Sequence, residues 1–470
     1  MEISLRTGLG AFEQEGRHGA GRMMGEWAPL FSDDSGVVLV QFIGMNFSSE
    51  QLGGLATAVG TPFWFYDAAV MQQRIADIRY VCGDAVQPRF AMKACPNGRV
   101  LREMERSGVW IDAVSGNEVL RALRAGYSGG SNPPRILFTA DVFRDNALDV
   151  VLEHGILPNV GSPGMIRQLR DAGYRGGVSV RVNPGFGHGH VNACDTGGPS
   201  SKHGVWPEDL PGLIEEAQAG GMRIEMLHAH IGSGPRFAEL HENLERLTDW
   251  FVDWLRKVPG ITGISLGGGI PHNYRNEGEQ IPLDPLRDLF ARCAGRLRAA
   301  STHGLRVEIE PGRYFVASSC ALVSRVSDVK RTRTNEKGNG AEFIMVDAGF
   351  VDLVRPAMYG SFHRISVVPQ AGGAVGEESD FVIAGPLCES GDVFTRDDAE
   401  LLQPRRFARP VPGDFVVLHD AGAYGYAMSS NYNSIGRAPQ VWVEGPGKAT
   451  LVSRRETVED IVRAECSEAL

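Results

Sequence analysis

The chain has 470 residues, and 57 Asp and Glu against 47 Lys and Arg give it a formal net charge of −10. This length predicts about two or three domains, with a core large enough to fold without disulfide bonds. The acidic balance disfavours nucleic acid or an anionic membrane as the main partner, because neither would be attracted at long range.

The seven cysteines are odd in number, and no two of them stand in a CxxC or CxxH pattern. We therefore expect reduced thiols, a cytoplasmic protein and no metal site of the zinc-knuckle kind. The apolar run at residues 37–43 is far shorter than the ~20 residues of a membrane span. The first thirty residues contain four glutamates and no apolar signal region, so no secretory signal is expected.

Residues 1–60 form a glycine-rich N-terminal segment with one strand-like stretch at 36–44, and we expect part of it to join a β domain. From residue 61 to 318, short apolar runs alternate with helical patterns. The eight runs are 89–92, 109–113, 135–138, 156–160, 178–182, 224–228, 261–266 and 306–309. Eight such alternations in about 250 residues predict an α/β fold, a (β/α)8 TIM barrel. A Rossmann fold is disfavoured, because no G-x-G-x-x-G follows the first strand.

The alternation of strand-like runs and helical patterns ends after residue 318. Strand-like runs separated by turn-rich loops lie at 321–329, 343–346, 381–383, 415–419 and 440–443. Helical periodicity is rare in this part. Residues 319–470 are therefore predicted to form a separate C-terminal β-sandwich or β-barrel domain.

The residue types that carry chemistry stand at the ends of the predicted barrel strands, where barrel enzymes build their active sites. Lys93 closes the first strand, Asp112 the second, and His228 and His230 the sixth. Gly267, Gly268 and Gly269 end the seventh strand, and the run Glu310-Pro311-Gly312-Arg313 ends the eighth.

Each of these residues also has an ordinary structural interpretation. Lys93 follows apolar residues, so its amine suits a Schiff base, but a lone lysine more often caps a strand. His230 offers a flat ring or an acid–base group, or is simply structural. A metal at His228 and His230 is disfavoured, because no carboxylates complete the ligand set. The glycine run fits a phosphate site or a plain tight turn.

The C-terminal part adds three clusters. Arg355 and Tyr359 stand four residues apart, Cys388 is followed by Glu389, and Tyr424 lies in a glycine-containing loop. Most free cysteines are small buried hydrophobic residues, but the polar loop around Cys388 favours a function.

Together these segments resemble the diaminopimelate decarboxylases, a family of fold-type III pyridoxal-phosphate enzymes. The resemblance runs from about residue 61 to 460. It rests on the motifs Lys93-Ala94-x-Pro96-Asn97, His230-Ile231-Gly232-Ser233, Gly267-Gly268-Gly269, Glu310-Pro311-Gly312-Arg313, Cys388-Glu389-Ser390 and Gly422-Ala423-Tyr424 in this order. Each motif is weak alone, and the ordered set is specific.

The resemblance implies a role for each matching residue. Lys93 would bind pyridoxal 5'-phosphate covalently, His230 would stack on its ring and Glu310 would pair with the ring nitrogen. The other cofactor contacts implied are Asp112, Ser233, Gly267, Gly268, Gly269, Gly312, Arg313 and Tyr424. Cys388 would donate a proton, and the substrate contacts implied are Arg313, Arg355, Tyr359, Glu389 and Tyr424.

The resemblance further implies decarboxylation of meso-2,6-diaminopimelate to L-lysine in a homodimer whose active sites are shared between the subunits. One alternative keeps the cofactor but acts on another diamino acid or a siderophore intermediate. An amino-acid racemase and a non-enzymatic pyridoxal-phosphate-binding regulator are more remote alternatives. Arg355 favours diaminopimelate, because its guanidinium can bind the distal carboxylate, which a simple ornithine- or lysine-type substrate lacks.

Overall fold

Eight parallel strands close into a barrel in the part of the chain from Met71 to Ala317, which we call the barrel unit. The computed structural model describes residues 2–4, 31–32, 38–41, 45–187, 196–232, 236–276, 281–336, 338–370, 373–397 and 399–466. The barrel strands are β6 Gln87–Ala91, β7 Trp110–Ala113, β8 Ile136–Thr139, β9 Leu157–Val160, β10 Gly177–Arg181, β11 Arg223–His228, β12 Gly263–Ser265 and β13 Arg306–Ile309. They correspond one to one to the eight predicted runs, so the predicted barrel is confirmed.

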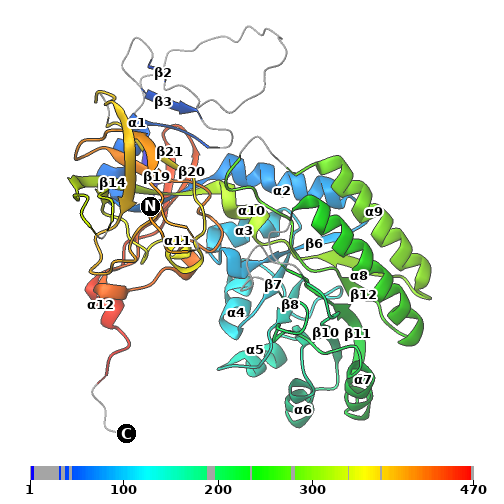
Figure 1. Cartoon of the computed structure of the whole chain (residues 1–470). Coiled ribbons are helices and arrows are strands. Elements are labelled where there is room, and N and C mark those ends of the chain that lie inside the picture. The colour runs from blue at the N-terminus through cyan, green and yellow to red at the C-terminus, as the bar shows by residue number, and fades with distance from the viewer. Residues whose placement is uncertain are drawn as a thin grey trace. The chain divides into compact units, whose positions relative to one another are not determined.

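Helices connect successive strands and lie outside the ring (Figure 1). They are α3 Gly98–Arg106, α4 Gly116–Arg124, α5 Ala147–Glu153, α6 Pro163–Asp171, α7 Leu210–Ala219, α8 Phe237–Lys257 and α9 Leu283–Ala300, with α2 Ala68–Cys82 before β6 and α10 Arg313–Val316 after β13. Asn97, Ser115 and Ser162 cap α3, α4 and α6 by accepting a hydrogen bond from a backbone N–H in the first turn. These caps explain why each helix begins soon after a strand ends.

A buried ion pair joins two neighbouring strands of the barrel. Arg89 of β6 and Glu308 of β13 are both fully buried, with Nε and Oε2 2.5 Å apart. Arg89 also donates a 2.7 Å hydrogen bond to the carbonyl of Pro134, and its guanidinium lies 4.9 Å from the ring centre of Trp110. Removing one partner of such a pair typically costs about 3–5 kcal/mol, because it leaves the other charge buried and unpaired.

The second compact unit, the sheet unit, combines Met1–Val70 with Ser318–Leu470. Its main sheet runs in the order β1-β21-β20-β5-β14-β15-β17-β18, and β19 joins β14 to β16. The strands are β1 Glu2–Ser4, β5 Phe63–Asp67, β14 Cys320–Arg331, β15 Glu342–Val346, β16 Ile365–Val368, β17 Glu378–Ala384, β18 Arg405–Ala408, β19 Phe415–Leu418, β20 Gln440–Gly445 and β21 Lys448–Ser453. The predicted separate β domain beside the barrel is confirmed by this sheet.

The sheet unit also takes in chain that precedes the barrel. The barrel domain was predicted to start at residue 61, whereas β5 pairs with β14 and β20 in the sheet unit. A smaller sheet consists of β2 Phe31–Ser32, β3 Val38–Gln41 and β4 Asn46–Ser48, and β3 falls within the strand-like stretch predicted at 36–44. The remaining helices of this unit are α1 Ser49–Val59, α11 Arg355–Tyr359 and α12 Val458–Val462.

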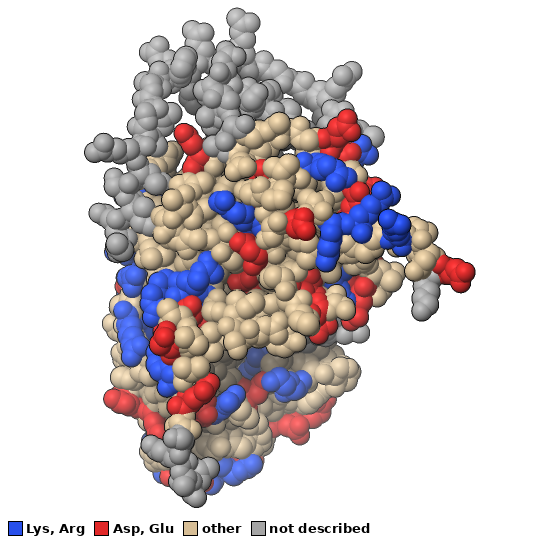
Figure 2. All heavy atoms as spheres, turned by 90° about the vertical axis from the view of Figure 1, so that its left-hand side faces the viewer, with Lys and Arg blue, Asp and Glu red and all other residues tan. Residues whose placement is uncertain are grey.

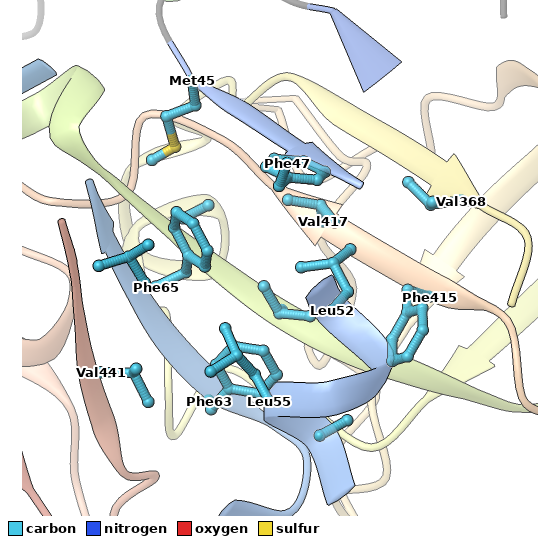
Figure 3. Close-up of a cluster of buried hydrophobic side chains, with 14 of the residues drawn as sticks. Met45, Phe47, Leu52, Leu55, Phe63, Phe65, Val368, Phe415, Val417 and Val441 are labelled. Carbon is cyan, nitrogen blue, oxygen red and sulfur yellow. The ribbon is translucent and has the colours of Figure 1, made fainter. Parts of the chain in front are cut away.

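Helix α1 belongs to the sheet unit because of the face that it buries. Leu52 and Leu55 point into one cluster with Phe65 of β5 and with Phe415 and Val417 of β19 (Figure 3). Burying a side chain of this size contributes roughly 1.5–3 kcal/mol. The part of the N-terminal segment from residue 45 onward is therefore a structural layer of the sheet unit.

Candidate active site

The C-terminal ends of the barrel strands bring several of the predicted residues to one opening. Lys93 follows β6, Asp112 lies near the end of β7, His228 ends β11, and Gly267 and Glu310 follow β12 and β13. In a closed parallel barrel, all strand ends of one kind surround the same mouth. The structure thus gathers residues that are more than 200 positions apart in the sequence.

Glu310 is buried at this mouth, and both of its carboxylate oxygens have partners. Oε2 lies 2.7 Å from Nε2 of His228, and Oε1 accepts a 2.7 Å hydrogen bond from the hydroxyl of Ser265. Burial by itself would raise the pKa of Glu310, but the contacts with His228 and Ser265 outweigh it and hold this pKa well below its usual range. Glu310 is therefore an anion at neutral pH, in a fixed orientation.

The two histidines at the C-terminal end of β11 have different partners. His228 faces Glu310, whereas Nδ1 of His230 accepts a 3.1 Å hydrogen bond from the backbone N–H of Gly268. An accepting Nδ1 places the ring proton of a neutral imidazole on Nε2. Burial, helped by the charge of Lys93, lowers the pKa of His230 well below its ordinary value. The His230 ring is thus a neutral, oriented surface.

The partner of His228 also bears on the metal alternative. Within the part of the chain that the structure describes, no group of three or more His, Cys, Asp or Glu side chains is placed to bind a metal ion. His228 instead orients a carboxylate.

The glycines at the ends of β12 and β13 stand where a side chain would collide with backbone. A Cβ at Gly268 would lie 2.5 Å from the carbonyl oxygen of Glu310, and one at Gly267 would lie 2.4 Å from that of Ala229. Gly267 and Gly269 also have φ angles of +70° and +106°, which L-residues rarely adopt. The packing of the mouth therefore requires glycine at these positions, and a run without side chains is compatible with a phosphate site.

Lys93 differs from expectation in its surroundings. Its side chain is exposed rather than enclosed by the apolar residues before it, because it lies in a turn beyond the end of β6 while Phe90 and Met92 remain buried. Burial and then the charge of Glu310 raise the pKa of Asp112 to about 8, and the charge of Lys93 opposes this shift. The ammonium of Lys93 thus interacts with a buried carboxyl group at the same mouth.

Arg313, the first residue of α10, is held by the loop that follows the glycine run. Its Nη1 donates a 2.8 Å hydrogen bond to the hydroxyl of Tyr274, and its guanidinium lies 5.7 Å from the centre of the Tyr274 ring. Gly312 beside it is also tightly packed, since a Cβ there would lie 3.1 Å from the carbonyl oxygen of Ala91. Ser233, the remaining predicted residue of this mouth, lies outside the described residues.

Sequence reasoning missed Arg181, which ends β10 and is buried with the charges of Asp141, Glu310 and Asp112 acting on it. Asp141 itself lies 2.7 Å from His203, measured from Oδ2 to Nδ1. Arg181 lies at the C-terminal end of the fifth predicted strand, as Asp112 does in the second, and that position was the signal that could have identified it.

Arg355, Tyr359 and Tyr424 lie in the sheet unit. Arg355 and Tyr359 begin and end α11, and Arg355 is buried with only 3% of its surface exposed. Tyr424 is half-buried and has a φ angle of +60°, which is uncommon for a residue other than glycine. Such a backbone strain is often found at functional positions.

Cys388 and Glu389 are exposed on a loop of the sheet unit whose base is fixed by Asp392. The carboxylate of Asp392 accepts backbone hydrogen bonds of 2.7 Å from Phe350 and 2.8 Å from Leu387. The exposure of Cys388 contradicts the interpretation of this thiol as a buried small hydrophobic residue. Its side chain is accessible on an anchored loop.

The face that Figure 2 shows carries both basic and acidic side chains. None of the described helices combines the length and apolar character of a membrane span.

Comparisons with known proteins identify the family of this chain. Residues 69–317 match the model of the pyridoxal binding domain of pyridoxal-dependent decarboxylases. The chain is 39% identical to the diaminopimelate decarboxylase of Escherichia coli K12 over 422 residues, which cover 89% of this chain and 97% of that protein. It is 41% identical to the diaminopimelate decarboxylase of Streptomyces coelicolor over 417 residues, covering 88% and 91%.

Solved structures lead to the same group. A crystal structure of a diaminopimelate decarboxylase superposes with a TM-score of 0.81 at 39% identity, covering 88% of this chain and 96% of that one. The Helicobacter pylori enzyme in complex with L-lysine has a TM-score of 0.75 at 26% identity, covering 88% and 98%. The chain therefore belongs to the diaminopimelate decarboxylase family of pyridoxal-dependent decarboxylases.

Proposed function

We propose that this chain removes CO2 from meso-2,6-diaminopimelate to give L-lysine, the last step of lysine biosynthesis, and that it does so in the cytoplasm. The observation that carries the proposal is the buried anion Glu310, held by His228 and Ser265 at the mouth where Lys93 stands. The choice of substrate rests on the names of the relatives that span nearly the whole chain.

The residues at the mouth fit pyridoxal 5'-phosphate, the cofactor of this family. The glycines Gly267–Gly269 and Gly312 place no side chain at this mouth, which suits a phosphate group. Oδ1 of Asp112 is a buried polar atom without a hydrogen-bond partner. Lys93 has the primary amine that condenses with an aldehyde. His230 would cover one face of the ring, and Glu310 would pair with a protonated ring nitrogen. Arg313, Ser233 and Tyr424 complete the proposed cofactor contacts.

When bound, this cofactor supplies an electron sink for the pair of electrons that departing CO2 leaves behind. The negative charge of Glu310 would favour the protonated, electron-withdrawing form of the cofactor ring. The neutral state of His230 suits a ring that covers the cofactor, since no second positive charge is placed against it.

The far end of the substrate carries a carboxylate and an ammonium group. The guanidinium groups of Arg313 and Arg355 and the hydroxyl of Tyr359 suit the distal carboxylate, and the carboxylate of Glu389 suits the distal ammonium. Tyr424 would contact substrate as well as cofactor. A substrate that lacks the distal carboxylate would leave the charge of Arg355 without its ligand.

A proton must reach Cα after CO2 has left, and we assign this step to the thiol of Cys388. A thiol carries a proton that it can donate as a general acid. Cys388 and Glu389 are exposed on their loop, so they are available to a second copy of the chain. We propose a homodimer in which they enter the partner's active site.

The proposal is tested by measuring CO2 release from meso-diaminopimelate, L-lysine and L-ornithine. We expect release from meso-diaminopimelate alone, and loss of both release and cofactor absorbance in Lys93→Ala. The matched control is Lys257→Ala, which removes an exposed lysine at the end of α8. Faster CO2 release from L-lysine or L-ornithine would mean that one of them is the substrate. Exchange of the α-hydrogen without CO2 release would indicate a racemase. Absence of both reactions would indicate a regulator.

A further inference from the structure

His363 is buried in the sheet unit between Arg355 and the backbone of β19's C-terminal end. Its Nε2 lies 3.0 Å from Nη1 of Arg355, and its Nδ1 lies 2.9 Å from the carbonyl oxygen of His419. His363 and Arg355 are 1% and 3% exposed, so this contact is shielded from solvent. Neither the predicted motifs nor the site assignments above include His363.

The partners determine the protonation of the imidazole. A carbonyl oxygen only accepts hydrogen bonds, so Nδ1 of His363 carries the proton and donates to His419. A guanidinium only donates, so Nε2 must accept from Arg355. Both requirements are met by one neutral tautomer. His363 therefore orients an N–H of Arg355 and leaves the positive charge of the guanidinium in place. A carboxylate in this position would neutralise that charge.

Local backbone geometry brings the two side chains together. Arg355 begins α11, and Gly360 ends this helix with a φ of +60°, a left-handed conformation typical of a helix C-terminus. The chain then turns back, and Ser361 reaches the second terminal nitrogen of Arg355, with its Oγ 3.3 Å from Nη2. His363 follows two residues later. The guanidinium is thus held by two groups from the segment that directly follows its own helix.

The second hydrogen bond of His363 connects Arg355 to the chain that leads to Tyr424. The carbonyl group that accepts it belongs to His419, five residues before Tyr424. The backbone N–H of Ala421 in that stretch donates a 2.8 Å hydrogen bond to the carbonyl of Cys320 in β14. One imidazole therefore spans from Arg355 to an anchored segment that carries another proposed substrate contact.

We propose that His363 is a positioning residue that sets the orientation of Arg355 toward the distal carboxylate of the substrate, and so contributes to selection of a substrate charged at both ends. This inference rests on the proposed function, because Arg355 is assigned to the substrate there. It deepens that assignment by naming the residue through which the arginine is oriented.

The test compares His363→Phe, which removes both hydrogen bonds, with His363→Gln, whose amide oxygen can accept from Arg355. In His363→Phe we expect the KM for meso-diaminopimelate to rise about tenfold or more, with kcat changed less than about threefold and cofactor absorbance unchanged. His363→Gln should recover most of the KM. The matched control is His419→Gln, which alters a neighbouring buried ring but keeps the backbone carbonyl.

A double variant separates positioning from general damage. If His363 acts through the arginine, His363→Phe should raise KM no further in an Arg355→Ala background. A further rise there, equal losses of kcat and cofactor absorbance in the Phe and Gln variants, or an unchanged KM in His363→Phe would each overturn the proposal.

Crystal structures of the wild type and His363→Phe distinguish this proposal from the proposed function. We expect the Arg355 guanidinium to leave its place in the variant. If the wild type releases no CO2 from meso-diaminopimelate while Arg355 still moves, the proposed function fails and the positioning role stands. If Arg355 keeps its place in the variant, the positioning role fails whatever the activity.

Discussion

The imidazole of His228 and the carboxylate of Glu310 meet 2.7 Å apart inside the barrel mouth, although 82 residues separate them in the chain. Both side chains are buried, so water does not screen their interaction. The pair connects the C-terminal end of β11 to the residue that follows β13. Its effect is to keep Glu310 ionised in a place where burial alone would favour the neutral acid.

Replacing His228 should therefore weaken the charge at Glu310. In His228→Phe, Glu310 loses the contact that lowers its pKa most. Its pKa should rise, because only weaker contacts then oppose the effect of burial. A lost hydrogen bond to a charged group is worth about 1.5–3 kcal/mol, which corresponds to a fall in kcat of about 10- to 150-fold. Steady-state kinetics measure the fall, and the spectrum of the bound cofactor reports whether it is retained. A kcat within twofold of wild type would contradict the role of this pair.

Gly268→Ala should impair cofactor binding. The added Cβ would lie 2.5 Å from the carbonyl oxygen of Glu310, so the backbone must shift at the proposed phosphate site. We expect the Kd for pyridoxal 5'-phosphate, measured by fluorescence titration, to rise at least about tenfold. Gly295→Ala in α9 is the matched control, since a Cβ there meets no atom within 4 Å. This control should bind normally and gain up to about 1 kcal/mol of stability from helix propensity.

Cys388→Ala should retain the cofactor and lose most turnover, because the thiol is proposed to protonate Cα and not to bind the ring. Cys466→Ala, which removes the other exposed cysteine among the described residues, should behave like wild type. The measurements are cofactor absorbance and CO2 release. Unchanged turnover in Cys388→Ala would remove this thiol from the reaction.

Mixing two inactive variants tests the shared site. If Cys388 enters the partner's site, a dimer of one Lys93→Ala and one Cys388→Ala subunit has one intact site. Random reassociation should then restore up to about a quarter of wild-type activity, since half of the dimers are mixed and each has one working site. No recovery after mixing, with mixed dimers demonstrated by differential tagging, would place Lys93 and Cys388 in the same subunit's site.

His363 makes stability depend on pH in a defined direction. Burial, followed by the charge of Arg355, lowers its pKa from 6.5 to about 3, with Arg405 adding to this shift and the His419 carbonyl and Asp420 opposing it. Below about pH 6.5 the unfolded chain therefore binds a proton at this position that the folded chain does not bind. The free energy of unfolding falls as pH falls through this window.

The comparison with His363→Gln isolates this contribution from the other titrating groups. Relative to that variant, the wild type should lose about 1.4 kcal/mol of stability for each pH unit between about pH 6 and pH 4. Urea unfolding at several pH values measures the difference. Parallel stability curves over that range would show that His363 is already protonated in the folded chain.

The sequence alone determined the barrel and the position of its reactive groups. Each of the eight strands is a short apolar run followed by a turn or cap signal, and those signals are local in the chain. Lys93, Glu310 and the glycines stand at strand ends, which a parallel barrel must bring to one opening. Chain order and residue type were therefore sufficient to predict where they lie.

Only the tertiary structure determined which strands pair and which side chains are in contact. The assignment of β5 to the sheet unit depends on pairing with β14 and β20, hundreds of residues away, and its own sequence would suit either unit. The same holds for His228 with Glu310 and for His363 with Arg355, since a side chain's charge and tautomer depend on burial and on partners that no local pattern specifies.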